Sequence, residues 1–395
     1  MLQVSPVDPC GRTNSVLQGT EYRTNPKGIR LSLRVCPVWV AGGCEQLPFR
    51  CFSPYSDQSP GKLQDLWWTA KVEQGKGRIS DGIRVGADDF SLSALRREFH
   101  RFPELGFQEE RTKAKVAKFL RDLGLEVHVG VGVVGILRSC EGNRAIGLRA
   151  DMDALPVHEA SGHEYPSETP GVMHACGHDG HMAMLLGAAR NLASDPGFSG
   201  TVVFIFQPNE EHGRGAQAMI KEGVLERFPI EEVYAIHNLP GAPAGQVSTR
   251  SGLICSSESL FEITIRGQGG HASMPQVCRD AITIGVEMVQ ALQSIVSRKL
   301  DPGAGAVVSV TEFQTDGQRN VLPGVAILKG DVRARSLVDR NNIETFMRQI
   351  ADGIAAAHCV SVNVNFSTEF VETINAKRPT DAVIEVAQRA GLDVI

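Results

Sequence analysis

The sequence lacks three features that would each point to a large class of proteins: a long apolar run, an excess of basic charge and a regular cysteine pattern. Its apolar stretches, such as TVVFIF, fall far short of the roughly 20 residues that a membrane-spanning helix needs. The 40 basic and 45 acidic residues leave a formal net charge of -5, so nothing indicates a nucleic acid or a membrane as partner. We expect the partner to be a small molecule.

The cysteines also exclude a disulfide framework. Nine cysteines, an odd number at irregular spacings in a chain of this length, fit a reducing compartment better than an oxidising one. A cytoplasmic location is therefore predicted. Organelle targeting stays open, because arginines are spread through the first 34 residues among a few acidic ones.

Length and pattern predict two domains after an extension. A chain of 395 residues with 42% hydrophobic content exceeds what one core usually supports. Residues 1–85 show no sustained period and are predicted to be an irregular extension. A catalytic domain is expected over residues 86–256, with a second domain over 257–368 inserted before the catalytic domain resumes at 369–395.

Three apolar runs in the first domain each end in side chains that can bind metal. The run in AIGLRADMD ends in Asp151 and Asp153, the run in TVVFIFQPNEE ends in Glu210 and Glu211, and the run in VYAIHN ends in His237. Continuous apolar strands separated by helices are typical of a mostly parallel sheet covered on both faces. Because ligands bind at the carboxyl ends of such strands, we expect one metal cluster there.

A dense motif, HACGHDGHMAM, adds further ligands to this cluster. It places Cys176 and His178 in a turn before a helix, with a glycine between them that favours a tight loop. Seven of the eleven histidines lie between residues 158 and 237, which chance and core packing explain poorly. Imidazole, thiolate and carboxylate together suit zinc or manganese, and bridging carboxylates suit a site of two metal ions. Of two adjacent glutamates, one can bind metal while the other accepts a proton from water.

The second domain has the order β-α-β-β-α-β, which is that of a ferredoxin-like fold. After its first strand, Gly269 and Gly270 precede His271. The two glycines are expected to permit positive φ and to present His271 as an exposed, directed side chain. Asn320, in a loop of the same domain, is a weaker candidate for function.

Several motifs resemble one family, in the right order, from about residue 90 to the end. LRREFHRFPELGFQE, GLRADMDALPV, MHACGHDGHMAMLLGAA, FQPNEE, AIHNLPG and GGHASMP are similar to the metallopeptidase-related amidohydrolases. These include hippurate hydrolases, N-acyl-amino-acid aminoacylases and the plant hydrolases of auxin conjugates. The resemblance implies an α/β zinc-peptidase-like sheet with an inserted lid and dimerisation domain. It also implies hydrolysis of an N-acyl amino acid to a carboxylic acid and a free amino acid.

The resemblance further implies a centre of two divalent metal ions, manganese or zinc. Its motifs match Cys176, His178, Glu211 and His237 to metal ligands and Glu210 to the general base that deprotonates the attacking water. The base would then return a proton to the leaving amine.

Three more residues receive roles through the same resemblance. Asp153 matches an aspartate that orients the metal site from outside the ligand set. His271 matches a lid histidine that stabilises the tetrahedral oxyanion, often from the neighbouring subunit of a homodimer, and Asn320 matches a lid asparagine that helps hold the substrate.

The sequence departs from the family at one ligand. Family members carry a further histidine after the lid, whereas the last histidine here is His358, expected at the end of a lid helix. One reading is a fragment, a truncated gene model or a splice form of an amidohydrolase. A second is a weakly active enzyme with one metal ion, in which His174, His181 or His212 substitutes.

Two non-catalytic alternatives also stay open. A truncated, impaired chain could pair with intact subunits through its lid, or the chain could store or deliver zinc. A storage site needs neither Glu210 nor His271, and this argues against the last alternative.

Overall fold

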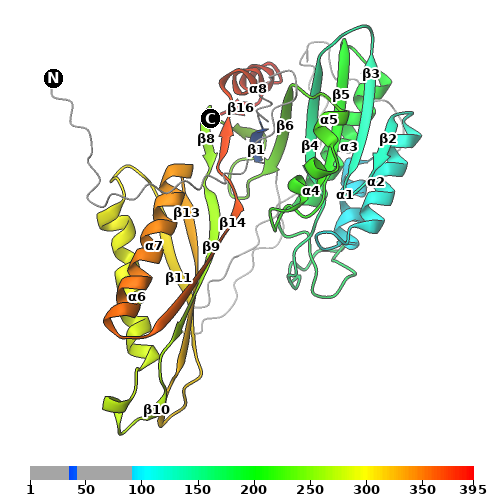
Figure 1. Ribbon diagram of the computed structural model, residues 1–395. Coiled ribbons are helices and arrows are strands. Elements are labelled where there is room, and N and C mark those ends of the chain that lie inside the picture. The colour runs from blue at the N-terminus through cyan, green and yellow to red at the C-terminus, as the bar shows by residue number, and fades with distance from the viewer. Residues whose placement is uncertain (1–34, 42–90) are drawn as a thin grey trace, which may run out of the picture. The chain divides into compact units, whose positions relative to one another are not determined.

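The computed structural model describes residues 35–41 and 91–395. Within these residues the main sheet has eight strands in the order β16-β7-β1-β6-β4-β5-β3-β2 (Figure 1). Their bounds are β1 Val35–Ala41, β2 Glu126–Val129, β3 Val133–Ser139, β4 Ala145–Asp151, β5 Gly200–Gln207, β6 Glu232–Asn238, β7 Gln246–Ser248 and β16 Asp393–Val394. The central strands β1, β6, β4 and β5 run parallel, and β3 and β2 join antiparallel at one edge. The mostly parallel sheet is therefore confirmed.

Helices cover both faces of this sheet because apolar side chains of its strands alternate between them. On β5, Phe204 and Phe206 belong to the core beneath one set of helices, whereas Val203 and Ile205 belong to the core beneath the other. The first set is α1 Leu92–Arg101, α2 Glu110–Asp122 and α3 His178–Ser194; the second is α4 Gly215–Lys221 and α5 Val224–Arg227. A strand that is apolar on both sides thus becomes a fully buried one.

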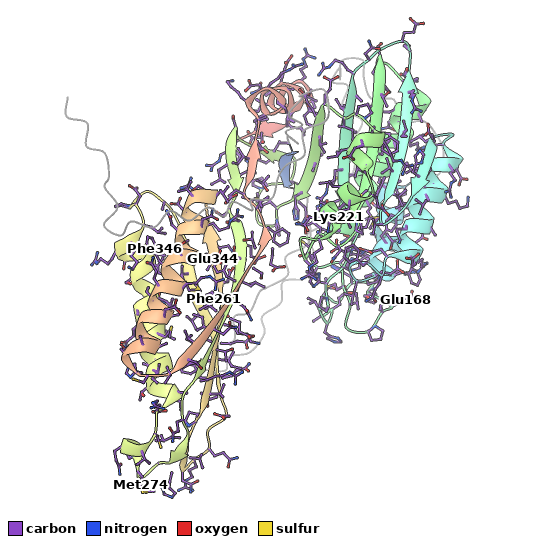
Figure 2. All side chains as sticks on the ribbon, viewed as in Figure 1. Glu168, Lys221, Phe261, Met274, Glu344 and Phe346 are labelled. Carbon is purple, nitrogen blue, oxygen red and sulfur yellow. The ribbon has the colours of Figure 1, made fainter. Side chains whose placement is uncertain are left out.

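The predicted order β-α-β-β-α-β is also confirmed. The elements are β9 Ser257–Arg266, α6 Ala281–Ser294, β11 Val307–Thr315, β13 Val325–Ala334, α7 Leu337–Ala357 and β14 Ser361–Phe370. The strands form an antiparallel sheet in the order β11-β13-β9-β14. Side chains of α6 and α7 share one core with it, to which Phe261, labelled in Figure 2, contributes. We call residues 257–370 the lid.

Short segments on either side of the lid pair with each other in the structure. Strand β15, Thr373–Asn375, pairs antiparallel with β8, Gly252–Cys255, and β16 pairs parallel with β7. Helix α8, Lys377–Arg389, lies between β15 and β16 in the chain. Contacts group Arg34–Ile395 as one unit, so the predicted boundaries at 256/257 and 368/369 stay predictions.

One expectation about the extension was wrong. Residues Val35–Ala41, which were predicted to be irregular, form β1 and pair with β6 and β7. Because the run is short and contains Pro37, which cannot donate a ladder hydrogen bond, its sequence pattern gave little sign of a strand. The rest of the predicted extension lies outside the described residues. In the described part of the chain, no helix is long and apolar enough to cross a membrane.

A buried ionic network joins α1 to α3. The Asp179 carboxylate, fully buried in the first turn of α3, accepts hydrogen bonds from Arg96 Nε at 2.8 Å and from His100 Nδ1 at 2.7 Å. His100 Nε2 lies 3.2 Å from Glu159. Burial alone lowers the pKa of His100, but the hydrogen bond and charge of Asp179 outweigh it and raise the pKa. The network thus ties the first turn of α3 to α1.

Two glycine substitutions in the lid are expected to change stability in opposite directions. A Cβ at Gly330 in β13 would lie 2.0 Å from the carbonyl oxygen of Ser309 and 2.3 Å from Phe261 Cζ, whereas a Cβ at Gly353 in α7 meets nothing within 4 Å. Gly330→Ala should lower the free energy of unfolding by about 1–3 kcal/mol through overpacking. Gly353→Ala should raise it by about 0.5–1 kcal/mol through helix propensity. Urea unfolding would measure both, and equal effects would contradict this account.

The His100 network predicts a pH-dependent contribution to stability. Because the folded-state pKa of His100 is raised, its contribution is fully present below the unfolded pKa of about 6.5 and is lost as pH rises through the folded pKa. His100→Gln should therefore lower the free energy of unfolding by more at about pH 6 than at about pH 9. Urea titrations of both proteins across this range test the sign. A loss that grows with pH would refute it.

Candidate metal centre

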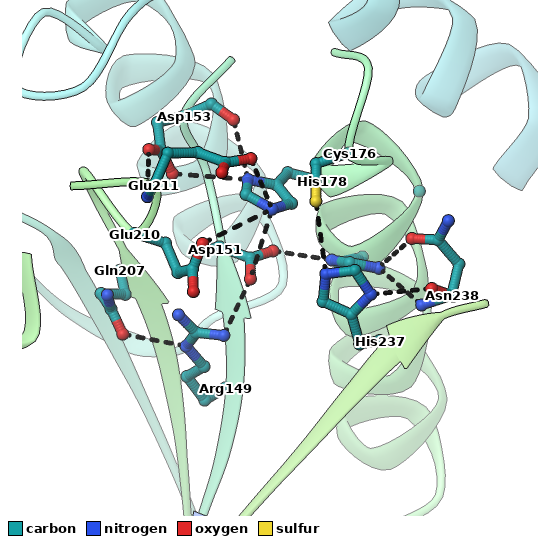
Figure 3. Close-up of polar contacts among 12 residues, drawn as sticks. Arg149, Asp151, Asp153, Cys176, His178, Gln207, Glu210, Glu211, His237 and Asn238 are labelled. Atoms are coloured by element: carbon teal, nitrogen blue, oxygen red, sulfur yellow. Dashed lines mark hydrogen bonds and ion pairs between the residues drawn. The ribbon is translucent and has the colours of Figure 1, made fainter. Parts of the chain in front are cut away.

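The three predicted strand-end groups meet at one edge of the main sheet. Strands β6, β4 and β5 are neighbours in the sheet and run parallel, so their carboxyl ends lie together. Asp151 ends β4, His237 lies at the end of β6, and the Glu210-Glu211 pair follows β5. The close-up in Figure 3 shows these side chains converging on His178. Distant sequence segments are thus brought to one point by strand order.

A tight turn delivers Cys176 and His178 to the same place. Gly177 has φ 88°, in the left-handed region that favours glycine, and His178 begins α3 directly after it. A Cβ on Gly177 would lie 2.4 Å from the Asn238 side-chain oxygen. Glycine is therefore required here by backbone conformation and by close packing.

Both histidines of the cluster are oriented by backbone carbonyls. Nδ1 of His178 donates to the Asp153 carbonyl oxygen at 2.8 Å, and Nδ1 of His237 donates to that of Asn238 at 2.7 Å. These bonds place the proton on Nδ1 and leave Nε2 of each ring as the lone-pair donor. Nε2 of His237 lies 3.4 Å from the Cys176 sulfur.

Carboxylates surround Nε2 of His178. Asp151 Oδ2 and Glu211 Oε1 each lie 3.7 Å from it, and Glu210 Oε2 lies 4.0 Å away. Three groups of side chains have ligand atoms close enough to share a metal ion, and His178 belongs to each of them. In the described residues they are Cys176, His178 and His237; Asp151, His178 and His181; and His178, Glu210 and Glu211.

Unsatisfied atoms show that these residues fit a metal cation. Nε2 of His178 and Oε1 of Glu211 are buried and have no hydrogen-bond partner among the described residues, although such groups normally have one. Burial alone lowers the pKa of His178, but the charge of Asp151 and the hydrogen bond to Asp153 raise it well above its usual value. The pocket therefore favours positive charge, and its nitrogen, sulfur and oxygen donors suit zinc or manganese.

Asp153 lies behind His178, away from Nε2. Its Oδ2 accepts the backbone N–H of Glu211 at 3.0 Å, and its Oδ1 is 3.4 Å from Nδ1 of His178. It is only 1% exposed. Asp153 thus connects the loop that carries Glu211 to the ring of His178.

Glu210 occupies a different environment from its neighbour Glu211. Burial is the main cause that raises its pKa to about 7, and the nearby charges of Asp151 and Glu211 add to it while Arg149 opposes it. A carboxyl group with a pKa near neutrality can both accept and donate a proton. The chemistry expected of Glu210 is therefore compatible with its surroundings.

A chain of hydrogen bonds beside the cluster was not predicted from the sequence. Arg149 donates to Asp151 Oδ2 at 2.8 Å, and His181 Nδ1 donates to Asp151 Oδ1 at 2.7 Å. Nε2 of His181 accepts the backbone N–H of Asn238 at 3.0 Å and lies 2.6 Å from its side-chain amide. One signal in the sequence was available. Arg149 and Asp151, two apart on a strand, share a face, and His178 and His181 are one helical turn apart.

The three proposed substitute histidines differ in position. His181 belongs to one candidate metal group, but both its ring nitrogens already have partners. His174 is 3% exposed, and in the part of the chain that the structure describes neither of its ring nitrogens has a hydrogen-bond partner. His212 bonds through Nδ1 to the Asn209 side chain at 3.0 Å. Neither His174 nor His212 appears in a candidate metal group of the described residues.

The two lid candidates lie side by side. Strand β10, Gly270–His271, pairs with β12, Val321–Leu322, and the N–H of Ala272 donates to the Asn320 carbonyl. His271 is exposed, as predicted, with Nδ1 2.7 Å from the Ser273 hydroxyl.

The reason given for the two glycines before His271 was wrong. Neither Gly269 nor Gly270 has positive φ. Close packing requires them instead, since a Cβ on Gly269 would lie 2.7 Å from the Leu322 carbonyl oxygen and one on Gly270 would lie 2.5 Å from the Cys278 sulfur.

Comparison with known proteins agrees with this geometry. Residues 147–395 match the model of Peptidase family M20/M25/M40. The hippurate hydrolase of Campylobacter jejuni is 39% identical over 297 residues, 74% of this chain and 77% of that protein. The N-acetyldiaminopimelate deacetylase of Exiguobacterium sibiricum is 37% identical over 292 residues, 73% of this chain and 78% of that protein.

A solved structure supports the same assignment. The Bacillus subtilis YXEP protein, a dinuclear metal binding peptidase from the M20 family, aligns with a TM-score of 0.67 and 32% identity. The alignment covers 77% of this chain and 80% of that one. With the family match extending over most of the chain, this protein belongs to Peptidase family M20/M25/M40.

Proposed function

We propose that this protein is a metal-dependent amidohydrolase that cleaves the amide bond of N-acyl amino acids. Water adds across the bond and gives a carboxylic acid and a free amino acid. The observation that carries this proposal is the position of Glu210, which lies 4.0 Å from Nε2 of His178 beside the donors of a candidate metal centre. The family's hippurate hydrolase and N-acetyldiaminopimelate deacetylase relatives support this substrate class.

The proposed metal ligands are Cys176, His178, Glu211 and His237, and the metal is zinc or manganese. Bound divalent metal would polarise the substrate carbonyl and lower the pKa of the attacking water. The oriented Nε2 atoms and the unpaired Glu211 oxygen support this assignment. Asp153 would hold His178 and the Glu211 loop in place.

Glu210 is the proposed general base. Its carboxylate takes a proton from the attacking water, and the same group returns that proton to the amine nitrogen as the C–N bond breaks. Because burial keeps the pKa of Glu210 about 7, both transfers are feasible near neutral pH. A storage site for metal would not need such a group.

His271 and Asn320 are proposed to act on the substrate from the lid. His271 would stabilise the oxyanion and Asn320 would hold the substrate, with His271 supplied by the partner subunit of a homodimer formed through the lid. The exposure of His271 and its pairing beside Asn320 support this reading.

Replacement of Glu210 should separate chemistry from metal binding. Glu210→Gln should lower kcat on N-benzoylglycine and N-acetyl amino acids by about 10²–10⁴-fold while it keeps bound metal, because it removes proton transfer only. Glu211→Gln should instead lose metal, since it replaces a charged ligand. Metal content by mass spectrometry and turnover on the panel test both. Turnover that survives Glu210→Gln would overturn the assignment of the base.

Mixing two inactive variants tests the role of His271 across subunits. Glu210→Gln and His271→Ala chains should each be nearly inactive alone. If His271 acts in the partner's site, random mixing restores about a quarter of wild-type turnover, because half of the dimers carry one complete site. If His271 acts within its own chain, no activity returns. Sedimentation of the mixture serves as the control for dimer formation.

A further inference from the structure

The loop between α1 and α2 contacts both carboxylate-bearing loops of the metal centre. The carbonyl oxygen of Glu104 accepts the N–H of Ala154, the residue after Asp153, at 2.8 Å, and Leu105 forms a bridge with Ala154. Five residues later, Glu109 Oε1 accepts the N–H of Asn209, the residue before Glu210, at 2.8 Å. We call residues 104–109 the brace.

The Glu109 side chain does not cap α2, although its position at the start of the helix suggests that it would. It is the N-cap residue of α2, yet its side chain makes no capping hydrogen bond. The capping is done by Glu104, whose two carboxylate oxygens accept the N–H groups of Arg111 and Thr112 at 3.1 and 2.8 Å. Glu109 is left free to turn inward towards Asn209.

Glu109 is also an expensive residue to bury. It is 0% exposed, and within 35–41 and 91–395 its Oε2 has no hydrogen-bond partner. Burial raises the pKa of Glu109 to about 7, with the charge of Asp153 adding to the effect. A buried polar group without a full set of partners costs stability. A glutamate at this position therefore needs an explanation other than stability.

Asn209, the partner of Glu109, is held on every side. It has φ 44°, an uncommon conformation for a residue with a side chain, and is 4% exposed. Its carbonyl oxygen accepts the N–H of Gly215 at 3.1 Å, and its side-chain oxygen lies 3.0 Å from His212 Nδ1. A Cβ on Gly106 in the brace would lie 2.0 Å from that same oxygen.

We propose that Glu109 is a positioning residue of the metal centre, which sets the direction of Glu210 and Glu211 by fixing the backbone of Asn209. A change in the φ angle of Asn209 would turn the carboxylates of Glu210 and Glu211 away from His178. The anchor of Glu104 on Ala154 fixes the Asp153 loop from the same brace. The inference rests on the proposed metal-dependent function, and Glu109 acts through its hydrogen bond to Asn209.

The test compares four variants in the cobalt-loaded protein, because the visible spectrum of Co²⁺ reports ligand geometry without turnover. Glu109→Gln keeps the shape and the accepting oxygen and should match wild type. Glu109→Asp and Glu109→Ala should bind Co²⁺ about 10- to 100-fold more weakly, with an altered spectrum. Glu110→Gln is the matched control, since its side chain is 80% exposed and pairs with Lys113 on the surface of α2.

Kinetics and folding complete the experiment. On an N-acyl amino acid, Glu109→Asp should lower kcat more than it changes KM, since it misdirects the base rather than the substrate. Circular dichroism checks the fold. If Glu109→Ala does not fold, Gly106→Ala strains the same Asn209 contact from the other side and should weaken Co²⁺ binding likewise.

The outcomes distinguish the two proposals. Folded Glu109→Asp and Gly106→Ala proteins with the wild-type cobalt spectrum and wild-type kcat would overturn the positioning role and leave the proposed function standing. A loss in Glu109→Gln as large as in Glu109→Asp would also overturn it. A wild-type protein that takes up no Co²⁺ would overturn the proposed function and the positioning role with it.

Discussion

The structure depends on the burial of two carboxylates at the end of β4. Asp151 and Asp153 are each 1% exposed, and ionised groups stay buried only when charge and hydrogen bonds compensate them. Arg149 and His181 compensate Asp151, and His178 and the Glu211 N–H compensate Asp153. His178 lies near both carboxylates from the first turn of α3, with Nε2 3.7 Å from Asp151 Oδ2 and Nδ1 3.4 Å from Asp153 Oδ1. A cation bound at His178 Nε2 would complete the compensation.

Much of this arrangement could be predicted because it follows from strand direction. An apolar run that ends in a carboxylate or a histidine predicts a buried strand, and it also predicts that the functional side chains lie at the carboxyl end of that strand. Parallel strands share one edge, so Asp151, Glu211 and His237 could be grouped before any distance was known. The secondary structure of the lid could be predicted as well, because its strands alternate with a period of 2 and its helices are amphipathic with a period of 3.6. The strand Val35–Ala41 was missed since a short run with a proline carries neither signal.

The contacts that the sequence did not predict join side chains to the backbone of distant segments. Glu109 meets Asn209 across 100 positions, and His181 meets Asn238 across 57. No period or spacing encodes such pairs, and a glutamate before a helix is ordinarily read as a solvated cap. Gly269 and Gly270 illustrate the same limit. The sequence predicted that glycine is needed at both positions, but the reason is close packing against the neighbouring strand and the Cys278 sulfur, not a turn conformation.

The main sheet and the lid hold their functional groups in different ways. Beside the main sheet, the brace binds the backbone N–H groups of Ala154 and Asn209, and His181 of α3 binds that of Asn238. Ligands on such restrained backbones lose little conformational entropy when metal binds, so little of the binding free energy is spent on ordering them. His271 has the opposite setting, since it is exposed on a two-stranded ribbon and its Nδ1 is hydrogen-bonded to the nearby Ser273. A rigid centre and an exposed lid histidine suit a reaction in which metal stays in place while substrate enters and leaves.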